Sequence, residues 1–318
     1  MDRKDRTNRK DQQPARVGLC SDARFLRHRA GGDHPECPER LGPITTALQT
    51  ADFGAPIVQI APRPVRKEEL LRAHKAEFLE EIERELGRGE AGWIDPDTYY
   101  SPETLEIAKL AAGATIDLCT AVAVGELDAG FALVRPPGHH ATGDQAMGFC
   151  IFNNVAIAVA QLRAAGKRVA LLDWDVHHGN GTEEILLGQS GVLFVSLHEW
   201  PQYPGTGAAC RRFTSDGGLI NVPLPAGTSD EMYLEIFDRE IGPAFAEFAP
   251  DLIVISAGFD GHRDDPLGGF LLTEAGYVAI VRRLQAIQSR IALVLEGGYD
   301  PAALSRSVLS VLGALVWP

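Results

Sequence analysis

The sequence predicts a single α/β domain in which helices cover both faces of an open, mostly parallel sheet. Two observations predict this fold class. Short apolar runs with many β-branched residues recur along the chain, and helix-like segments lie between most of them. Continuous hydrophobicity is typical of strands buried on both faces, and alternating strands and helices form the crossover units of a parallel sheet. No internal repeat and no linker rich in Pro, Gly or Ser divides the chain.

The predicted elements follow a short N-terminal tail. Residues 1–15 carry charges of both signs and almost no apolar side chains, so we expect a flexible tail 1–15 followed by one domain, 16–318. The apolar runs expected to be strands are Phe131–Val134, Arg168–Leu172, Val192–Leu197, Leu252–Ser256 and Ile291–Leu295. The amphipathic or helix-like segments expected to be helices are Glu68–Arg88, Pro102–Val124, Asn154–Ala165 and Thr273–Ser289.

Composition argues against several classes of protein. With 43 acidic and 30 basic residues the net charge is -13, so we expect no direct nucleic-acid binding, which normally requires a basic surface. No run approaches the roughly 18 apolar residues of a membrane span, and the N-terminus lacks the apolar stretch of a signal peptide, so we expect no membrane association. The five cysteines have no CxxC spacing, which fits a reducing compartment and predicts a cytoplasmic protein.

Polar, chemically reactive residues concentrate directly after four of the predicted strands. The four segments are RPPGHH (135–140), DWDVHHGNG (173–181), AGFD (257–260) and EGGY (296–299). Because the carboxyl ends of parallel strands meet at one edge of the sheet, we expect these side chains to converge in one crevice. The glycines beside them permit tight turns and a close approach of the backbone.

Three of these residues predict a metal site. Asp175 and His177 are two residues apart, so in an extended segment their side chains point to the same side. With Asp260 they supply three ligands and leave a fourth position for water, which is the composition of a catalytic zinc site, although iron, manganese or cobalt would also suit it. An Asp-x-His pair alone is more often a solvated loop or a salt bridge. The polar residues at the ends of the other predicted strands favour the interpretation as a metal site.

The remaining strand-end residues predict the chemistry. Beside a metal, the imidazoles of His139 and His140 are natural proton carriers near neutral pH. We expect Asp173 to orient one of these imidazoles and Asn180 the other. Tyr299 is placed to donate a hydrogen bond to an oxyanion. A metal, a base, an acid and an oxyanion donor together indicate hydrolysis of an amide or ester.

Six motifs resemble those of the histone deacetylase superfamily, which also includes acetylpolyamine amidohydrolases and acetoin-utilisation proteins. In order, the motifs are RPPGHH, GFCIFNN, DWDVHHGNGT, SLHEWPQYPGTG, SAGFD and LEGGY. The resemblance runs from about Val17 to Trp317 and implies the arginase/deacetylase fold. Asn180, where class I members carry an aspartate, and Glu296 before the glycines make the chain similar to the class II and bacterial branch.

The resemblance implies a role for each matching catalytic residue. His139 would be the imidazole paired with Asp173. His140 would carry the main general base and acid duty, although accounts of the family differ on how the pair divides the work. Tyr299 would polarise the acetyl carbonyl, and because it is retained the resemblance implies an active enzyme.

The resemblance also implies two metal ions. One catalytic zinc ion would be bound by Asp175, His177 and Asp260. A potassium ion beneath it would be bound, partly through main-chain carbonyls, by Asp173, Asp175, His177, Ser196 and Leu197.

Five further residues match the substrate tunnel of the family. Gly148 and Phe149 match one wall, and Tyr203 matches the opposite wall, where phenylalanine is more frequent. Aromatic walls suit the methylene stem of an acyl-lysine. Leu267 offers no countercharge where a polyamine-selective branch carries glutamate, and Asp97 matches a rim aspartate that grips the substrate backbone. On sequence alone, Phe149 is better explained as a core residue and Asp97 as a turn-capping residue.

The leading hypothesis is a zinc-dependent amidohydrolase that removes acetyl or related acyl groups from lysine side chains of proteins. Acetylpolyamines or other small acylated amines are the alternative substrates with the same chemistry. A non-catalytic acyl-lysine binding module and a two-manganese ureohydrolase are the alternatives from other classes. Arg40 matches an arginine below the active site, for which a structural ion pair and a part in acetate release are both open. Homo-oligomer formation is also left open.

Overall fold

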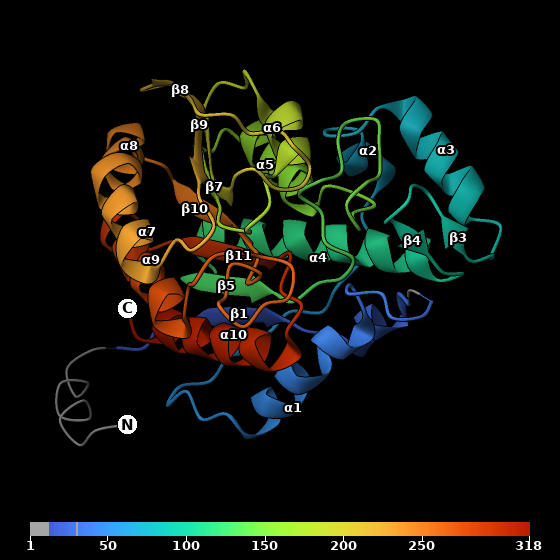
Figure 1. The fold of residues 1–318 in the computed structure, drawn as a ribbon, viewed down its shortest axis with the longest axis horizontal. Helices are drawn as coiled ribbons and strands as arrows, with labels where there is room; N and C mark the ends of the chain where they lie inside the picture. The colour runs from blue at the N-terminus through green and yellow to red at the C-terminus, as the bar shows by residue number, and fades with distance from the viewer. Residues whose placement is uncertain (1–12, 30) are drawn as a thin grey trace.

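A computed structural model describes residues 13–29 and 31–318 of the chain. Its strands are β1 (Val17–Cys20), β2 (Val58–Gln59), β3 (Gly92–Trp93), β4 (Tyr99–Tyr100), β5 (Ala129–Ala132), β6 (Val169–Asp173), β7 (Val192–Glu199), β8 (Cys210–Thr214), β9 (Gly217–Leu224), β10 (Leu252–Ala257) and β11 (Ile291–Leu295). Among the described residues, nine of them form one sheet in the order β2-β1-β5-β11-β10-β6-β7-β9-β8 (Figure 1). All neighbours are parallel except β8 and β9, so the sheet is open and mostly parallel, as predicted.

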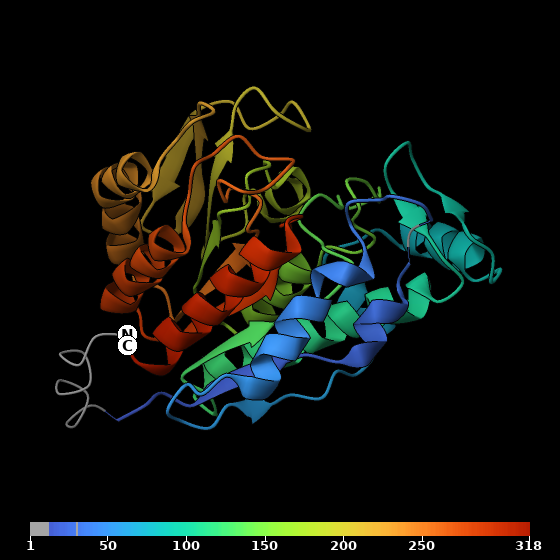
Figure 2. The same ribbon diagram turned by 60° about the horizontal axis from the view of Figure 1, so that its bottom comes forward.

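Helices cover both faces of this sheet. They are α1 (Gly42–Thr50), α2 (Lys67–Leu70), α3 (Ala76–Leu86), α4 (Thr104–Val124), α5 (Asn154–Ala164), α6 (Asn180–Leu186), α7 (Asp230–Ile236), α8 (Gly242–Phe248), α9 (Glu274–Ile287) and α10 (Pro301–Val316). Shorter helical turns are η1 (Ala23–Arg27), η2 (Pro38–Arg40) and the π-helical η3 (Phe237–Ile241). Figure 2 shows α1 and α10 in front of the strands and α4 behind them, and α9 packs beside α10.

The five predicted strands are all present, and the structure adds others, among them the edge strands β2 and β8. Predicted strand Phe131–Val134 is shifted, because β5 covers Ala129–Ala132. The strands not predicted include β1 and β2, of which β2 has only two residues, both exposed. Strand β2 lies at the edge, where a short strand pairs on one side only and needs no long apolar run, whereas β1, with four residues, lies between β2 and β5.

The prediction of a single helix over Glu68–Arg88 is wrong. The structure divides it into α2 and α3, separated by a turn around His74. The amide of Lys75 donates to the carbonyl of Gly143 at 2.8 Å, and the His74 ring bonds to the carbonyl of Thr142 at 2.9 Å. At Lys75 the backbone amide therefore bonds to a distant loop rather than to the preceding helical turn, which a local amphipathic pattern cannot reveal.

Helix α4 corrects the expectation that no segment of the chain is long and apolar enough to span a membrane. It is 21 residues long and apolar enough, by length and composition, to cross a membrane. However, 72% of its apolar window is buried inside the protein, where it packs against α5 and several strands of the sheet. Its hydrophobicity is therefore explained by its place in the core.

The predicted tail 1–15 falls mostly on residues 1–12, which lie outside the described residues. Of the remaining three, Ala15 already bonds to the domain, since its amide donates to the carbonyl of Val316 at 2.9 Å. The deacetylase-type domain predicted over 16–318 contains the nine-stranded sheet and all the helices described above.

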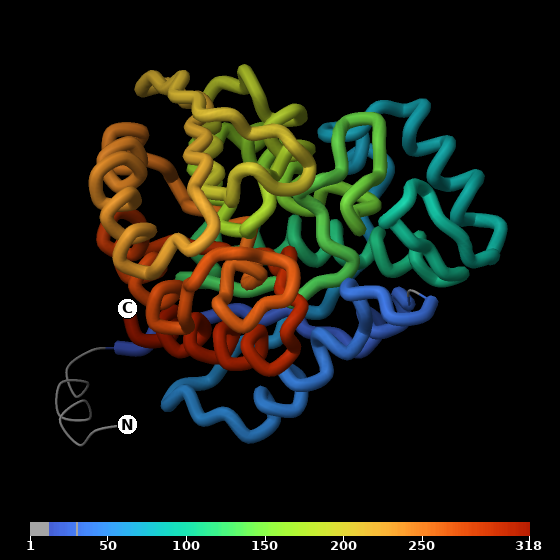
Figure 3. Tube along the Cα trace, viewed as in Figure 1, coloured from blue at the N-terminus to red at the C-terminus, as the bar shows by residue number. Residues whose placement is uncertain are grey.

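The loops that follow the parallel strands meet at one edge of the sheet. In Figure 3 the green, yellow and orange loops come together near the centre of the view. They line one cavity, to which residues between 97 and 299 contribute. The fold thus brings chemically active residues from distant parts of the chain into one place.

Candidate metal centre and active site

Asp175, His177 and Asp260 converge as the sequence predicted. One ligand atom from each lies within 4.8 Å of the others. Nδ1 of His177 lies 3.1 Å from Oδ1 of Asp175 and 3.1 Å from Oδ2 of Asp260. Both carboxylates are buried, and one nitrogen with two oxygens is a donor set that suits zinc.

Two glycines and several amides hold this triad in place. A Cβ on Gly258 would lie 2.0 Å from Oδ2 of Asp175, and one on Gly297 would lie 2.0 Å from Oδ2 of Asp260. The amide of Gly297 donates to Oδ2 of Asp175 at 2.8 Å, and the amide of Val176 donates to Oδ1 of Asp260 at 2.9 Å. Each carboxylate therefore has one oxygen fixed by the backbone and the other directed toward His177.

The electrostatics of the triad favour a bound cation. Burial, and then the nearby charge of Asp175, raise the pKa of Asp260 to about 7. Burial opposes a charged imidazole, but hydrogen bonds to Asp175 and Asp260 raise the pKa of His177 to about 10. The pocket thus stabilises positive charge at Nδ1 of His177, the position where the ligand atoms meet.

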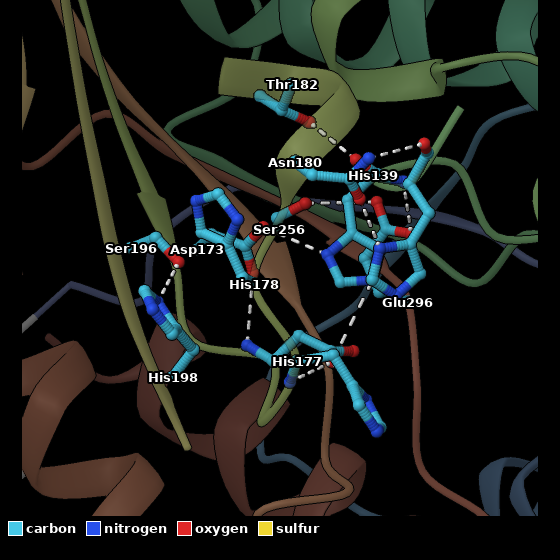
Figure 4. Close-up of polar contacts among 12 residues, drawn as sticks. His139, Asp173, His177, His178, Asn180, Thr182, Ser196, His198, Ser256 and Glu296 are labelled. Carbon is cyan, nitrogen blue, oxygen red and sulfur yellow. Dashed lines mark hydrogen bonds and ion pairs between the residues drawn. The ribbon is translucent and has the colours of Figure 1, made fainter. Parts of the chain in front are cut away.

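His139 bonds to a carboxylate. Its Nδ1 lies 3.0 Å from Oδ2 of Asp173, an acceptor, so Nδ1 carries the proton (Figure 4). Nε2 lies 3.8 Å from Oδ1 of Asp175. Burial lowers the pKa of His139, but the charges of Asp175 and Asp173 outweigh burial and hold this pKa well above its usual range.

His140 has the opposite environment. Its Nδ1 lies 2.8 Å from Oδ1 of Asn180, which is neutral. Asn180 Nδ2 faces the carbonyl of His140 and the sulfur of Met147, both at 3.5 Å, which supports this orientation of the amide. Burial, followed by the charge of His139, holds the pKa of His140 well below its usual range. Environments that separate two pKa values in this way distinguish a base from an acid.

Tyr299 follows β11 and is held by its backbone. Its amide donates to Oδ2 of Asp265 at 2.6 Å, and the guanidinium of Arg40 lies over its ring, 5.0 Å from the centroid. Burial raises the pKa of the Tyr299 hydroxyl well above its usual range, so this hydroxyl keeps its proton and can donate it in a hydrogen bond.

The predicted substrate residues line one cavity with the catalytic ones. The cavity measures about 220 Å³, and its lining residues are Asp97, His140, Gly148, Phe149, His177, Gln202, Tyr203, Leu267 and Tyr299. Phe149 meets Tyr299 edge to face at 5.9 Å, and Tyr203 meets His140 edge to face at 5.0 Å. Phe149, which could have been a core residue, therefore faces the cavity. Gln202 is a lining residue that the sequence did not predict.

At the cavity rim, Asp97 and Leu267 differ in how they are held. The turn around Asp97 is capped by Asp95, whose Oδ1 accepts the amides of Asp97 and Thr98 at 3.1 and 2.6 Å. The carboxylate of Asp97 is thus not required as the cap. Leu267 is 37% exposed, and its amide donates to Oδ1 of Asp265 at 2.9 Å.

The five residues predicted to hold potassium lie at the ends of two adjacent strands. Asp173 on β6 is the sheet partner of Ser196 on β7, and Leu197 follows. Asp175 and His177 lie in the loop after β6, and all five are buried except His177, which is partly exposed. Ser196 Oγ lies 2.9 Å from Nδ1 of His198 (Figure 4).

Sequence reasoning assigned no structural role to two buried acids that support the site, although it marked Glu296 as typical of one branch of the family. Oε2 of Glu296 accepts the amides of Gly138 at 2.6 Å and His139 at 3.1 Å, and Oε1 accepts the Ser256 hydroxyl at 3.0 Å. Burial raises the pKa of Glu296 to about 7. The position of Glu296 after a predicted strand was the available signal.

A second buried acid, Glu36, explains Arg40. Glu36 bonds to Arg40 at 3.0 Å and to Arg135 at 2.7 Å, and His28 lies 3.3 Å away. Arg40 also donates to the carbonyl of Gly298 at 2.6 Å. The structure therefore shows the ion pair for Arg40 and ties that pair to the loop that carries Tyr299.

Taken together, the sheet and the cavity define a hydrolase whose active site is built around a metal-ligand triad. Comparison with known proteins gives its family. The model of the histone deacetylase domain matches residues 34–315, and the chain belongs to this family. It is a deacetylase or amidohydrolase of that family, as its sequence motifs predicted.

Relatives and a solved structure agree with this assignment. A probable deacetylase of Archaeoglobus fulgidus is 39% identical over 310 residues, covering 94% of this chain and 86% of that protein. A histone deacetylase-like amidohydrolase of Pseudomonas aeruginosa is 36% identical over 296 residues, covering 90% and 78%. The crystal structure of the HDA15 HD domain superposes with a TM-score of 0.89 at 38% identity, covering 95% of this chain and 89% of that one. The predicted arginase/deacetylase fold is therefore confirmed.

Proposed function

We propose that this protein is a zinc-dependent amidohydrolase that removes acetyl, or a related acyl group, from lysine side chains of proteins. One observation carries the proposal. His177, the partly exposed member of the Asp175–His177–Asp260 triad, lines the same aromatic-walled cavity as His140 and Tyr299. A ligand set, a base and an oxyanion donor within one narrow cavity are what hydrolysis of an acyl-lysine requires.

The metal ligands would be Asp175, His177 and Asp260. Their nitrogen and oxygen atoms, the glycines that make room for both carboxylates and the stabilised positive charge at His177 all fit a divalent ion. A zinc ion bound there would polarise the acyl carbonyl and lower the pKa of a water molecule.

His140 is the residue best suited to accept the proton of the attacking water. Because Oδ1 of Asn180 accepts the Nδ1 proton of His140, the lone pair of this neutral imidazole is on Nε2. His139, held as a cation by Asp173 and Asp175, would supply positive charge and a proton for the leaving amine. The two imidazole rings lie 4.0 Å apart, so a proton delivered to one is close to the other.

Tyr299 would hold the acyl oxygen as it becomes negative. Its hydroxyl remains protonated, and its backbone is fixed by Asp265, so the donor is in place before the reaction. A preorganised donor of this kind stabilises the transition state without reorganisation.

The walls of the cavity favour a long apolar stem. Phe149 and Tyr203 present ring surfaces to the space between them, which suits the four methylenes of lysine. Asp97, at the rim, would accept amide protons of a peptide backbone, which favours a protein substrate. Leu267 at the rim supplies no negative charge for a polyamine. Small acylated amines remain the second candidate because the reacting groups are the same.

The direct test compares two substrates. Purified protein of known metal content is incubated with an acetyl-lysine peptide and, separately, with an acetylated polyamine, each with and without a chelator. Chelator-sensitive release of acetate from the peptide supports the proposal. Release from the polyamine alone moves the substrate to small amines, and a metal-loaded protein that hydrolyses neither contradicts the proposed function.

We also propose a potassium ion held by Asp173, Asp175, His177, Ser196 and Leu197. The His198 ring bonds to the carbonyl of Gly207 through Nε2–H, so its Nδ1 accepts the Ser196 hydroxyl proton. The lone pairs of the Ser196 oxygen are then free for a cation, and oxygen donors of this kind suit a hard ion. Potassium should raise the thermal midpoint of unfolding above that in a tetramethylammonium buffer of equal ionic strength. Equal midpoints would contradict the site.

We also propose a cytoplasmic location for the protein, because its five cysteines are free thiols.

A further inference from the structure

The loop 200–207 carries Tyr203, and two buried histidines hold the far end of this loop. His178 lies directly after the metal ligand His177 but points away from the triad. Its Nδ1 lies 2.8 Å from Oγ1 of Thr206, and its Nε2 lies 2.8 Å from Oε2 of Glu183. Because a carboxylate only accepts, Nε2 carries a proton, and Nδ1 bonds to the Thr206 hydroxyl.

His198 holds the next residue of the same loop. Its Nε2 donates to the carbonyl of Gly207 at 2.8 Å, and its ring lies 4.6 Å from the ring of His178. Gly207 has φ +89°, and a Cβ there would lie 2.4 Å from Nε2 of His198 and 2.6 Å from Cγ of His178. A glycine is thus required where the loop passes against the two rings.

The contacts on this loop are anchored in the sheet and in α6. Oε2 of Glu183, on α6, also accepts the side-chain amide of Asn221 at 2.7 Å, and Asn221 lies on β9. His198 lies on β7, which pairs with β9 on the side toward the middle of the sheet. The loop therefore bonds to rigid elements at Thr206 and Gly207.

At its middle, the loop places Tyr203 against the catalytic residues. The Tyr203 ring meets His140 edge to face at 5.0 Å and His177 at 6.3 Å. Near Tyr203, the loop is otherwise tied by the side chain of Gln202, which accepts the Tyr203 amide at 3.0 Å and donates to the carbonyl of Leu267 at 3.3 Å. This second tie runs to the exposed rim, not to the sheet.

We propose that His178 is a positioning residue that sets the width of the substrate cavity by holding Thr206, and with it the Tyr203 wall. This inference rests on the proposed function, because it treats Tyr203 as the wall against which an acyl-lysine packs. When the bond to Thr206 is lost, the loop moves outward and the Tyr203 ring packs less closely on the methylene stem of the substrate.

The test compares Thr206→Val with Thr206→Ser. Valine keeps the shape of the side chain and removes the hydroxyl that bonds to His178, whereas serine keeps that hydroxyl. Thr46→Val, at an exposed threonine of α1 far from the cavity, is the matched control. These variants leave the metal ligands, His140 and Tyr299 unchanged.

Two measurements read the result. Hydrogen exchange of residues 199–208, followed by mass spectrometry, tests the positioning without any substrate. We expect faster exchange in Thr206→Val and wild-type exchange in Thr206→Ser and Thr46→Val. KM for an acetyl-lysine peptide should rise by about tenfold in Thr206→Val only, with kcat little changed, which is the low end of what one methylene in an apolar pocket supplies.

The outcomes separate this inference from the proposed function. Unchanged exchange in Thr206→Val overturns the positioning role, whether or not the protein hydrolyses the peptides. Faster exchange with an unchanged KM overturns the part of the inference that concerns cavity width. A wild-type protein that hydrolyses no acyl-lysine peptide contradicts the proposed function, and with it the claim about substrate packing, while exchange still decides the positioning role.

Discussion

Nδ1 of His140 lies 2.8 Å from the side-chain oxygen of Asn180. The partner of His140 is a neutral amide. The corresponding atom of His139, its Nδ1, faces the carboxylate of Asp173 instead. A neutral partner fixes the tautomer of His140 and stabilises its cation less than a carboxylate would, which leaves the imidazole able to act as a base.

Replacing Asn180 by aspartate tests this relationship. The added carboxylate stabilises the cationic form of His140 and raises its pKa, so the base is protonated up to a higher pH. The acidic limb of the pH profile of kcat/KM should therefore move to higher pH by about one unit. A profile identical to that of the wild type would show that His140 is not the group that titrates in this limb.

Glu296 predicts an effect on stability. Truncation in Glu296→Ala leaves the buried amides of Gly138 and His139 without acceptors, which should lower the free energy of unfolding by about 3 kcal/mol. Glu296→Gln keeps one carbonyl oxygen for these amides and should cost less than half as much. Urea unfolding of the three proteins measures both effects. Equal losses in the two variants would contradict the role assigned to these hydrogen bonds.

Metal affinity should depend on pH because of Asp260. Burial and Asp175 raise the pKa of Asp260 to about 7 in the absence of metal, so below pH 7 metal binding must displace its proton. Zinc affinity, measured by competition with a chromophoric chelator, should therefore fall as the pH drops from 8 to 6. An affinity that is constant over this range would contradict the coupling. Asp260→Ala should copurify with far less metal than the wild type.

His74 predicts how fold stability depends on pH. Burial lowers its pKa to about 4, against an unfolded value of about 6.5, so the unfolded chain binds more protons between these values. Stability is fully present above pH 6.5 and falls as the pH decreases, with a loss of about 3 kcal/mol by pH 4. Urea unfolding from pH 7 to pH 4 should show a steeper loss for the wild type than for His74→Gln. Parallel curves would exclude this contribution.

Much of the fold follows from local patterns in the sequence. The interior strands are continuous apolar runs because both faces are buried, so β6, β7, β10 and β11 were predictable. The edge strand β2 has two exposed residues, and no such pattern marks it. The break between α2 and α3 was not predictable because it depends on a contact between Lys75 and Gly143, 68 residues apart.

The candidate site divides in the same way. Asp175, His177 and Asp260 follow predicted strands, so the rule that strand ends converge was enough to group them. The contact of Arg40 with Gly298 joins residues 258 positions apart, and the contact of Glu36 with Arg135 joins residues 99 apart. No spacing rule connects such residues, because only the folded chain brings them together.

The measurement that tests the central claim most directly is hydrolysis of an acetyl-lysine peptide by Tyr299→Phe, with the metal content determined on the same samples. Loss of one preorganised donor to the developing oxyanion should lower kcat by about 10²–10³-fold. The metal content should match that of the wild type, because Tyr299 is not a ligand. A variant that retains wild-type kcat with its metal bound would contradict the account of this active site.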